Sequence, residues 1–190
     1  KKVLIANRGE IALRIIRACR ELGIKTVAVY SEADKESLHL RYADECHCVG
    51  PAQPEQSYLN IDKIIQTAKN FQCEAIHPGY GFLAQIPSFA KACESNEIEF
   101  IGPSSDALKK MCSKIRAREI VASAGVPVIP GSIETVESED DVVEVAEKVG
   151  YPVLVKAVYG GGGRGMRIAS NKNDIRQAME LARLEADFAF

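Results

Sequence analysis

A run of glycines near the C-terminal end is the clearest candidate for chemistry in the sequence. Four glycines stand in a row and are followed by an arginine and a fifth glycine: Gly160, Gly161, Gly162, Gly163, Arg164 and Gly165. Glycines have no Cβ atom, so their backbone N–H groups can approach phosphate oxygens closely. The run lacks the Gly-Lys-Ser/Thr of a Walker A loop, and it lies between two strand-like segments instead of between a strand and a helix. The sequence therefore predicts a phosphate-binding hairpin loop, with a flexible linker or turn as the alternative.

Lys156 is the cation that lies closest to this loop on its N-terminal side. It ends the apolar run at 151–155. A lysine buried at the end of such a strand is costly unless it is paired, and a nucleotide phosphate would be a suitable partner. A lysine that simply reaches solvent from the strand end is the alternative. The same two interpretations apply to Arg164.

Two loops in the first half of the chain follow predicted strands. Residues 7–10, Asn-Arg-Gly-Glu, join the first strand to the first helix, where open α/β sheets often bind ligands. They fit equally a structural turn in which Glu10 complements the helix dipole. Residues 77–82 bring His77 and Tyr80 to a second strand end, and the alternative there is a rigid Pro/Gly loop that packs Tyr80 and Phe82 under the next domain.

The totals exclude several classes of protein. The chain has 190 residues, is 46% hydrophobic and 26% charged, and has a formal charge of -2, so it has no general electrostatic attraction to nucleic acid or to an anionic membrane. It has no apolar run near the roughly 20 residues that span a bilayer and no signal-peptide pattern. The six cysteines are expected to be reduced. The Cys46-His47-Cys48 triplet lacks a second ligand pair at zinc-site spacing and is not expected to bind metal.

The elements that position these residues follow from apolar periodicity. Strands are predicted at 2–6, 25–30, 73–77 and 97–101, and helices at 10–22, 61–68 and 88–93. Such alternation predicts a parallel sheet with helices on its faces. A boundary is expected near 109–114. Beyond it the sequence predicts helices at 107–111, 116–123 and 138–148, a linker at 126–132, strands at 152–157 and 166–169, and a helix from 174. That last helix has no cap or polar tail, so we expect the natural chain to continue.

At this point several segments resemble a known family. Their order and spacing resemble the start of biotin carboxylases: KVLIANRGEIALRIIRACRELGIKTVAVYSEAD, SYLNIDKII, EAIHPGYGFL, FIGPSSDAL, AGVPVIPGS and GYPVLVKAVYGGGGRGMRI. These ATP-grasp ligases are subunits or domains of acetyl-CoA, propionyl-CoA, methylcrotonoyl-CoA, pyruvate and urea carboxylases. The resemblance implies an α/β fold, with a Rossmann-like pre-ATP-grasp domain and parallel sheet at 1–111. The beginning of an ATP-grasp domain, with its α+β flap subdomain, would occupy 112–190.

The resemblance also implies an activity and its residues. Biotin carboxylases form carboxyphosphate and ADP from bicarbonate and ATP, and then transfer the carboxyl group to N1′ of biotin on a carrier protein. The expected loop over the phosphates runs to Met166, and residues matched to ATP binding are Lys114, Lys156, Gly160, Gly161, Gly162, Gly163, Arg164, Gly165 and Met166. The loop with His77 and Tyr80 would approach the biotin pocket. Arg17 and Glu21 fall where bacterial relatives make a dimer contact.

Some positions depart from the family pattern. Cys112-Ser113 replace the usual Gly-Asp before Lys114, and residues 84–86 read Ala-Gln-Ile where Ser/Ala-Glu-Asn is usual, which puts a role of that loop in doubt. Tyr159 stands where some relatives have a further glycine. The family's magnesium ligands, bicarbonate-binding residues and catalytic arginine lie beyond Phe190. No catalytic or metal-binding residue is therefore expected within this chain, and the fragment alone is expected to be inactive.

The resemblance implies ATP with Mg²⁺ as the nucleotide and carrier-bound biotin as the carboxyl acceptor. Expected partners are a biotin carboxyl carrier protein or domain, a carboxyltransferase component and a second copy of the full-length chain, with neither nucleic acid nor membrane. Bacterial cytoplasm and mitochondrial matrix both fit, and the final acceptor cannot be read from this region. Alternative functions are another ATP-grasp ligase, of the carbamoyl-phosphate synthetase or purine-pathway carboxylase type, and a non-catalytic nucleotide-binding module.

Overall fold

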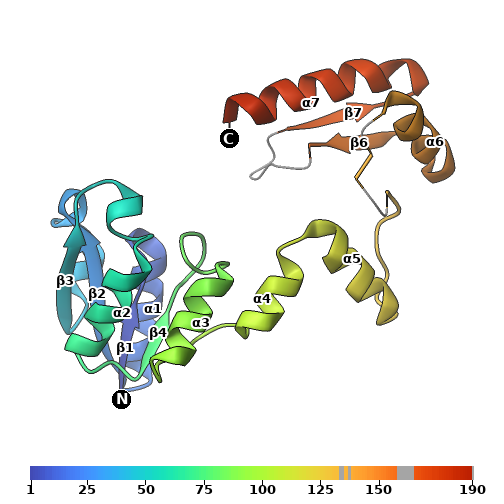
Figure 1. The fold of residues 1–190 in the computed structure, drawn as a ribbon. Helices are drawn as coiled ribbons and strands as arrows, with labels where there is room; N and C mark the ends of the chain where they lie inside the picture. Colours follow the sequence, from blue (N-terminus) through green and yellow to red (C-terminus); the bar gives the residue numbers. More distant parts are fainter. Residues whose placement is uncertain (133–134, 137, 158–164, 190) are drawn as a thin grey trace. The chain divides into compact units, whose positions relative to one another are not determined.

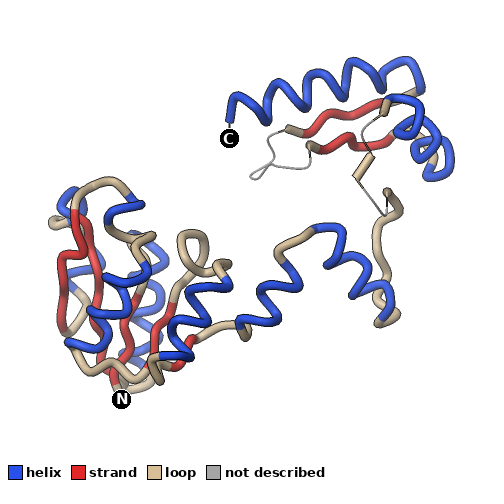
Figure 2. Tube along the Cα trace, viewed as in Figure 1, coloured by secondary structure: helices blue, strands red, loops and turns tan. Residues whose placement is uncertain are grey.

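The computed structural model describes residues 1–132, 135–136, 138–157 and 165–189 (Figure 1). The chain divides into two units, Lys1–Lys114 and Ile115–Phe190, each with its own internal packing. The first unit contains a five-stranded sheet, and the second contains a two-stranded sheet with helices (Figure 2). Each unit is described below by itself.

The first unit is built on a fully parallel sheet in the order β3-β2-β1-β4-β5. Its strands are β1 (Lys2–Ile5), β2 (Lys25–Ser31), β3 (Glu45–Gly50), β4 (Ala75–His77) and β5 (Glu99–Phe100). The chain first adds strands on one side of β1 and then returns to the other side, so the strand order reverses between β1 and β4. In open α/β sheets the carboxyl ends of the strands at such a reversal flank a crevice. The predicted parallel α/β fold is confirmed.

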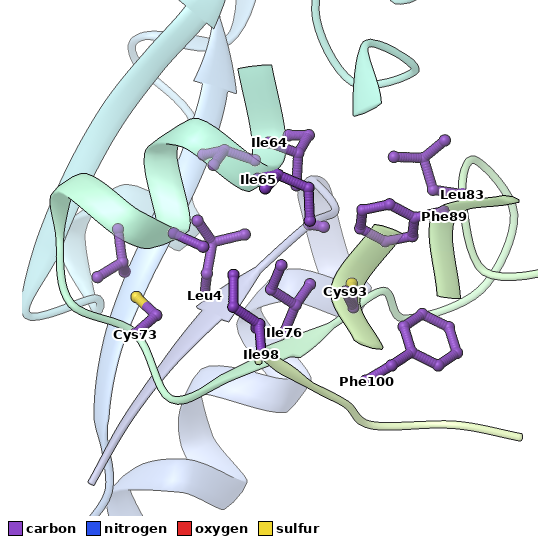
Figure 3. Packing of buried hydrophobic residues seen from close by; sticks show 14 of the residues in the cluster. Leu4, Ile64, Ile65, Cys73, Ile76, Leu83, Phe89, Cys93, Ile98 and Phe100 are labelled. Atoms are coloured by element: carbon purple, nitrogen blue, oxygen red, sulfur yellow. The ribbon is translucent and has the colours of Figure 1, made fainter. Parts of the chain in front are cut away.

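Helices cover both faces of this sheet, and alternate residues of β1 supply both cores. Val3 and Ile5 pack with the buried side of α1 (Gly9–Glu21). Leu4 points to the other face, where it packs against α2 (Ile61–Asn70) and α3 (Pro87–Ser95), as Figure 3 shows. A strand that is covered on both faces needs apolar side chains at successive positions, which explains the continuous apolar run in β1. Helix α4 (Ser105–Met111) follows β5.

The second unit packs helices against one face of an antiparallel hairpin. Strands β6 (Val153–Lys156) and β7 (Met166–Ala169) pair in register. Its helices are α5 (Lys114–Ser123), α6 (Glu139–Val149) and α7 (Ile175–Ala189). Ala169 of β7 packs with Val143 of α6 and Ile175 of α7 in a small buried core. The Ser138 hydroxyl accepts a hydrogen bond from the Asp141 N–H (3.1 Å) and so caps the start of α6.

The predicted elements are present with small shifts at their ends. The strand expected from residue 73 begins at Ala75, and the last helix begins at Ile175 after a 3-10 turn at Lys172–Asp174. Further 3-10 turns lie at Glu32–Asp34, Leu38–Arg41 and Pro54–Gln56, and β3 was absent from the predicted strands. All six cysteines are free thiols. Among the described residues, no helix has the length and apolar character to cross a membrane.

Candidate functional site

The β6–β7 hairpin has one covered face and one open face. Val153 and Val155 pack with the helices on the covered face. Cross-strand pairing places Leu154 opposite Ile168 and Lys156 opposite Met166. These four side chains share the other face of the hairpin. Leu154 is 47% exposed and Ile168 is 69% exposed, so apolar surface lies open beside an ammonium group.

This face can bind a ligand with both a flat apolar part and an anionic part. Exposed aliphatic side chains offer contact area to a heterocyclic ring, and an adjacent lysine offers a charge to phosphate. The expectation that Lys156 is buried is wrong. Its side chain is exposed, because a two-stranded sheet with helices on one side leaves alternate residues of each strand open. The alternative, a lysine that reaches solvent from the strand end, agrees with the structure.

The glycine run begins and ends on this hairpin, and its C-terminal end is anchored. The predicted hairpin is confirmed by the antiparallel register, which the Ala157 N–H extends by donating to the Gly165 carbonyl (2.8 Å). The Gly165 N–H donates to Oε2 of Glu185 on α7 (3.0 Å), and Nη1 of Arg167 donates to the same oxygen (2.6 Å). Gly165 has a φ of +69°, a conformation that favours glycine.

These contacts fix the start of β7 to α7. Residues 160–163 and Arg164 lie outside the described residues, as does the side chain of Lys114, the first residue of α5. Of the residues matched to ATP binding, the structure therefore brings together Lys156, Gly165 and Met166.

A second set of polar contacts lies at the carboxyl ends of β1 and β4. Asn7 is only 3% exposed, and its Nδ2 donates to the carbonyl of Pro78 (2.7 Å) and to that of Tyr80 (2.8 Å). Its Oδ1 accepts the Arg8 N–H (2.8 Å). A Cβ at Gly79 would lie 2.9 Å from Nδ2 of Asn7, so the two loops pack too closely for a larger residue there. Asn7 thus joins the two loops, and the structure favours the structural turn for residues 7–10.

Contacts among four further residues complete this edge of the sheet. The Tyr58 hydroxyl donates to Oδ2 of Asp34 (2.6 Å) and accepts the N–H of Ser31 (2.8 Å). Nη1 of Arg8 lies 3.2 Å from the same Asp34 oxygen. Burial, with the Asp34 hydrogen bond as a further cause, raises the pKa of Tyr58 to about 12, so the phenol stays protonated. The sequence signal for this group was weak, because Asp34 and Tyr58 are 24 residues apart.

The loop at 77–82 places its aromatic residues differently. Tyr80 is 59% exposed within the first unit, whereas Phe82 stacks on Tyr58 with ring centroids 5.1 Å apart. Nδ1 of His77 accepts the Gly79 N–H (3.1 Å), and burial lowers the pKa of His77. Phe82 therefore packs within the first unit, and the packing of this loop under the next domain stays a prediction. His77 shapes the loop, and Tyr80 is available to a ligand or partner.

The remaining predicted site residues lie on α1 of the first unit. Arg17 and Glu21 are exposed on α1, and the Arg17 guanidinium lies 5.9 Å from the Tyr42 ring centroid. His47 packs its ring near Phe71 (5.5 Å). Within the described ranges, no group of three His, Cys, Asp or Glu side chains is arranged to hold a metal ion.

Comparison with known proteins finds matches along the whole chain. The model "Biotin carboxylase, N-terminal domain" matches residues 1–108, and "Carbamoyl-phosphate synthase L chain, ATP binding domain" matches residues 113–190. Biotin carboxylase 1 of Bacillus subtilis (strain 168) is 53% identical over 190 residues, which are 100% of this chain and 42% of the relative. The mitochondrial methylcrotonoyl-CoA carboxylase subunit alpha of Rattus norvegicus is 50% identical over 189 residues, 100% of this chain and 26% of that protein.

Solved structures agree with these matches. The biotin carboxylase of Campylobacter jejuni, in a complex named beta-gamma-ATP, has a TM-score of 0.90 and 48% identity, and the match covers 100% of this chain and 43% of that one. The biotin carboxylase domain of Hydrogenobacter thermophilus 2-oxoglutarate carboxylase, crystallised as a dimer with MgADP, ADP and bicarbonate, has a TM-score of 0.89 and 47% identity, with coverage of 100% and 42%. The chain thus spans less than half the length of these relatives.

Proposed function

Because this chain belongs to the biotin carboxylase family, we propose that it forms the N-terminal part of an ATP-dependent ligase that carboxylates biotin. ATP would phosphorylate bicarbonate to give carboxyphosphate and ADP. The carboxyl group would then pass to N1′ of biotin on a carrier protein, with release of phosphate. The observation that carries this proposal is the open face of the β6–β7 hairpin, where Lys156 and Met166 are cross-strand partners next to the glycine run.

In this proposal the hairpin holds the nucleotide. Lys156 neutralises phosphate charge, and its exposed ammonium is free to meet a ligand. The apolar side chains of Leu154, Met166 and Ile168 offer surface to the base. The family resemblance assigns further phosphate contacts to Lys114 and to the run Gly160, Gly161, Gly162, Gly163, Arg164 and Gly165. Since Gly165 already donates its N–H to Glu185, we assign it the role of fixing the loop end.

Magnesium and the second half of the reaction are assigned to residues outside this chain. The family resemblance assigns the protein ligands of the Mg²⁺ that accompanies ATP to positions beyond residue 190. The positive charge of that ion would reduce phosphate repulsion in the transition state. The 190-residue chain alone is accordingly expected to lack carboxylase activity.

The division of labour between the units follows the proposed domains. We assign 1–111 to a pre-ATP-grasp domain and 112–190 to the beginning of the ATP-grasp domain, in line with the unit Lys1–Lys114 and the family matches. In the first domain, exposed Tyr80 and the His77 loop would approach the biotin pocket. Exposed Arg17 and Glu21 on α1 would contribute to a dimer of the full-length chain.

Partners and location follow the relatives. A biotin carboxyl carrier protein or domain would deliver biotin, and a carboxyltransferase component would take the carboxyl group onward. Relatives include bacterial biotin carboxylases and mitochondrial subunits, so bacterial cytoplasm and mitochondrial matrix are the proposed locations. Because the carboxyltransferase component chooses the final acceptor, no acceptor is assigned.

Another ATP-grasp ligase is the second candidate function. The match of residues 113–190 to the carbamoyl-phosphate synthase ATP-binding model supports it, since the two classes share this region. The match of residues 1–108 to the biotin carboxylase N-terminal model favours the first candidate. The two candidates differ in one measurable property, the dependence of ATP hydrolysis on biotin.

The test measures ATP hydrolysis by the full-length parent protein with and without biotin and bicarbonate. Wild-type protein is expected to require both. Lys156→Ala should lower kcat/KM for ATP by about 100- to 1000-fold, the usual cost of removing a group that stabilises reaction charge. Lys172→Ala, at an exposed lysine in the 3-10 turn before α7, is the matched control and should remain near wild type. Hydrolysis that is indifferent to biotin would support the other ligase, and an unaffected Lys156 variant would refute the hairpin site.

A further inference from the structure

The loop at 77–82 has an unfavourable backbone. Three of its residues have positive φ angles: Gly79 (+66°), Gly81 (+67°) and Phe82 (+38°). Glycine tolerates this region, but a bulky aromatic residue rarely adopts it. Such a conformation persists only where the surrounding structure holds it. The contacts of this loop should therefore include groups that impose its shape.

Tyr58 holds the C-terminal end of the loop. Its ring stacks on Phe82 with 5.1 Å between centroids and 13° between ring planes. Tyr58 is 1% exposed, and its hydroxyl is fixed by Asp34 and by the backbone of Ser31. The ring consequently cannot slide or rotate without breaking buried hydrogen bonds. It forms a rigid surface against which Phe82 is held.

Asn7 holds the other end of the loop. Its two amide donors contact the carbonyls of Pro78 and Tyr80. The backbone of Tyr80 thus lies between two anchors, one at its own carbonyl and one at Phe82. Its side chain remains exposed, as a residue that meets a ligand must be.

We propose that Tyr58 is a positioning residue for biotin binding: through its stack on Phe82 it holds the strained loop and so orients Tyr80. This inference rests on the proposed function, because Tyr80 is assigned to the biotin pocket there. A side chain presented by a fixed loop loses less conformational freedom on binding than one presented by a loose loop. Loss of the stack should weaken biotin binding, while the nucleotide steps on the β6–β7 hairpin are unchanged.

The test compares four variants of the full-length parent protein in biotin-dependent ATP hydrolysis with free biotin. Tyr58→Leu and Phe82→Leu each remove one ring of the stack, and Tyr58→Phe keeps both rings. Phe71→Leu is the matched control, because it removes a half-buried ring that contacts His47 and lies outside the loop. The measured quantities are KM for biotin, KM for ATP, kcat and the thermal midpoint.

Tyr58→Leu and Phe82→Leu should raise KM for biotin about three- to tenfold with KM for ATP within about twofold of wild type, a loss confined to one binding step. Phe71→Leu should keep KM for biotin near wild type even where the thermal midpoint falls. Tyr58→Phe, which keeps the stack but loses the hydroxyl contacts with Asp34 and Ser31, should raise KM for biotin less than the two leucine variants do. If ATP hydrolysis by the wild type depends on biotin but Tyr58→Leu and Phe82→Leu both leave KM for biotin unchanged, this inference is overturned and the proposed function stands. A wild type whose ATP hydrolysis ignores biotin would overturn the proposed function as well.

Discussion

Replacing Asn7 tests whether the two loops at the strand reversal depend on one side chain. Asn7→Ala removes the donors to the carbonyls of Pro78 and Tyr80 and the acceptor for the Arg8 N–H. Asn7 is buried, so water cannot easily replace all three partners. Each buried polar group that loses its partner costs about 1–3 kcal/mol, and partial relaxation gives a total of about 2–4 kcal/mol in the unfolding free energy of the first unit.

Hydrogen exchange measures this loss in the first unit alone. The amides of β1 lie in the centre of the sheet and should exchange through global unfolding of that unit. A loss of about 2–4 kcal/mol corresponds to roughly 30- to 900-fold faster exchange. Asn70→Ala, at an exposed asparagine that ends α2, is the matched control and should change the rate by about threefold at most. If exchange in β1 were equally fast in both variants, Asn7 would not stabilise this edge of the sheet.

Asn7→Asp tests the same contacts through the pH dependence of its destabilisation. A carboxylate at this position would face two carbonyl oxygens, so burial and repulsion should raise the pKa of the new side chain in the folded state. A group whose folded pKa lies above its unfolded value contributes stability below the unfolded pKa and loses it as the pH rises through the folded pKa. Relative to wild type, Asn7→Asp should therefore be more destabilised at about pH 8 than at about pH 5. A penalty independent of pH would show that the aspartate turns away from the two carbonyls.

Two further predictions concern titratable groups of the first unit. Burial lowers the pKa of His39 from its ordinary value of 6.5, so its contribution to stability should be full above about pH 6.5 and fall as the pH drops below that value. His39→Gln should flatten this dependence of the unfolding free energy on pH, measured by denaturant titrations. The same dependence on pH in wild type and variant would contradict the assignment. Burial raises the pKa of Cys73 and of Cys93 to about 11, whereas Cys112 is exposed. Iodoacetamide at about pH 8 should therefore modify Cys112 well before Cys73 or Cys93, as mass spectrometry of digests would show, and equal rates would mean that the two buried thiols become accessible without unfolding.

Local pattern was sufficient for most elements of the fold. Strands β1 and β2 are buried on both faces, so their continuous apolar runs were unambiguous once helices followed them. Strand β3 was missed because it lies at the sheet edge, where only Val49 is buried and the Cys-His-Cys triplet has no apolar run. An edge strand needs less apolar surface and gives a weaker signal.

The site was less accessible to sequence reasoning than the fold. The apolar run before Lys156 predicted a buried strand, but only packing shows that α6 and α7 cover one face of the hairpin and leave the other open. The contacts of Tyr58 with Asp34 and Phe82 join segments that are distant in the chain. Periodicity reports on local structure and cannot pair such residues. The glycine run by itself predicted only a phosphate-binding loop. Its assignment to ATP, and that of Lys114, came from the family resemblance.

The strand reversal in the first unit also explains why the nucleotide is assigned elsewhere. A dinucleotide-binding sheet has glycines after its first strand, so that pyrophosphate can approach the backbone and the helix start. Here Asn7 occupies that position, and its side chain is bonded to the loop after β4. Helix α1 follows without a glycine-rich approach, and Arg8 is engaged by Asp34. Asn7 and Arg8 are thus engaged by protein groups, and the contacts of Asn7 also hold the loop that exposes Tyr80. In the proposed function, a sheet of Rossmann-like order would therefore serve to present Tyr80, and the hairpin of the second unit would bind phosphate.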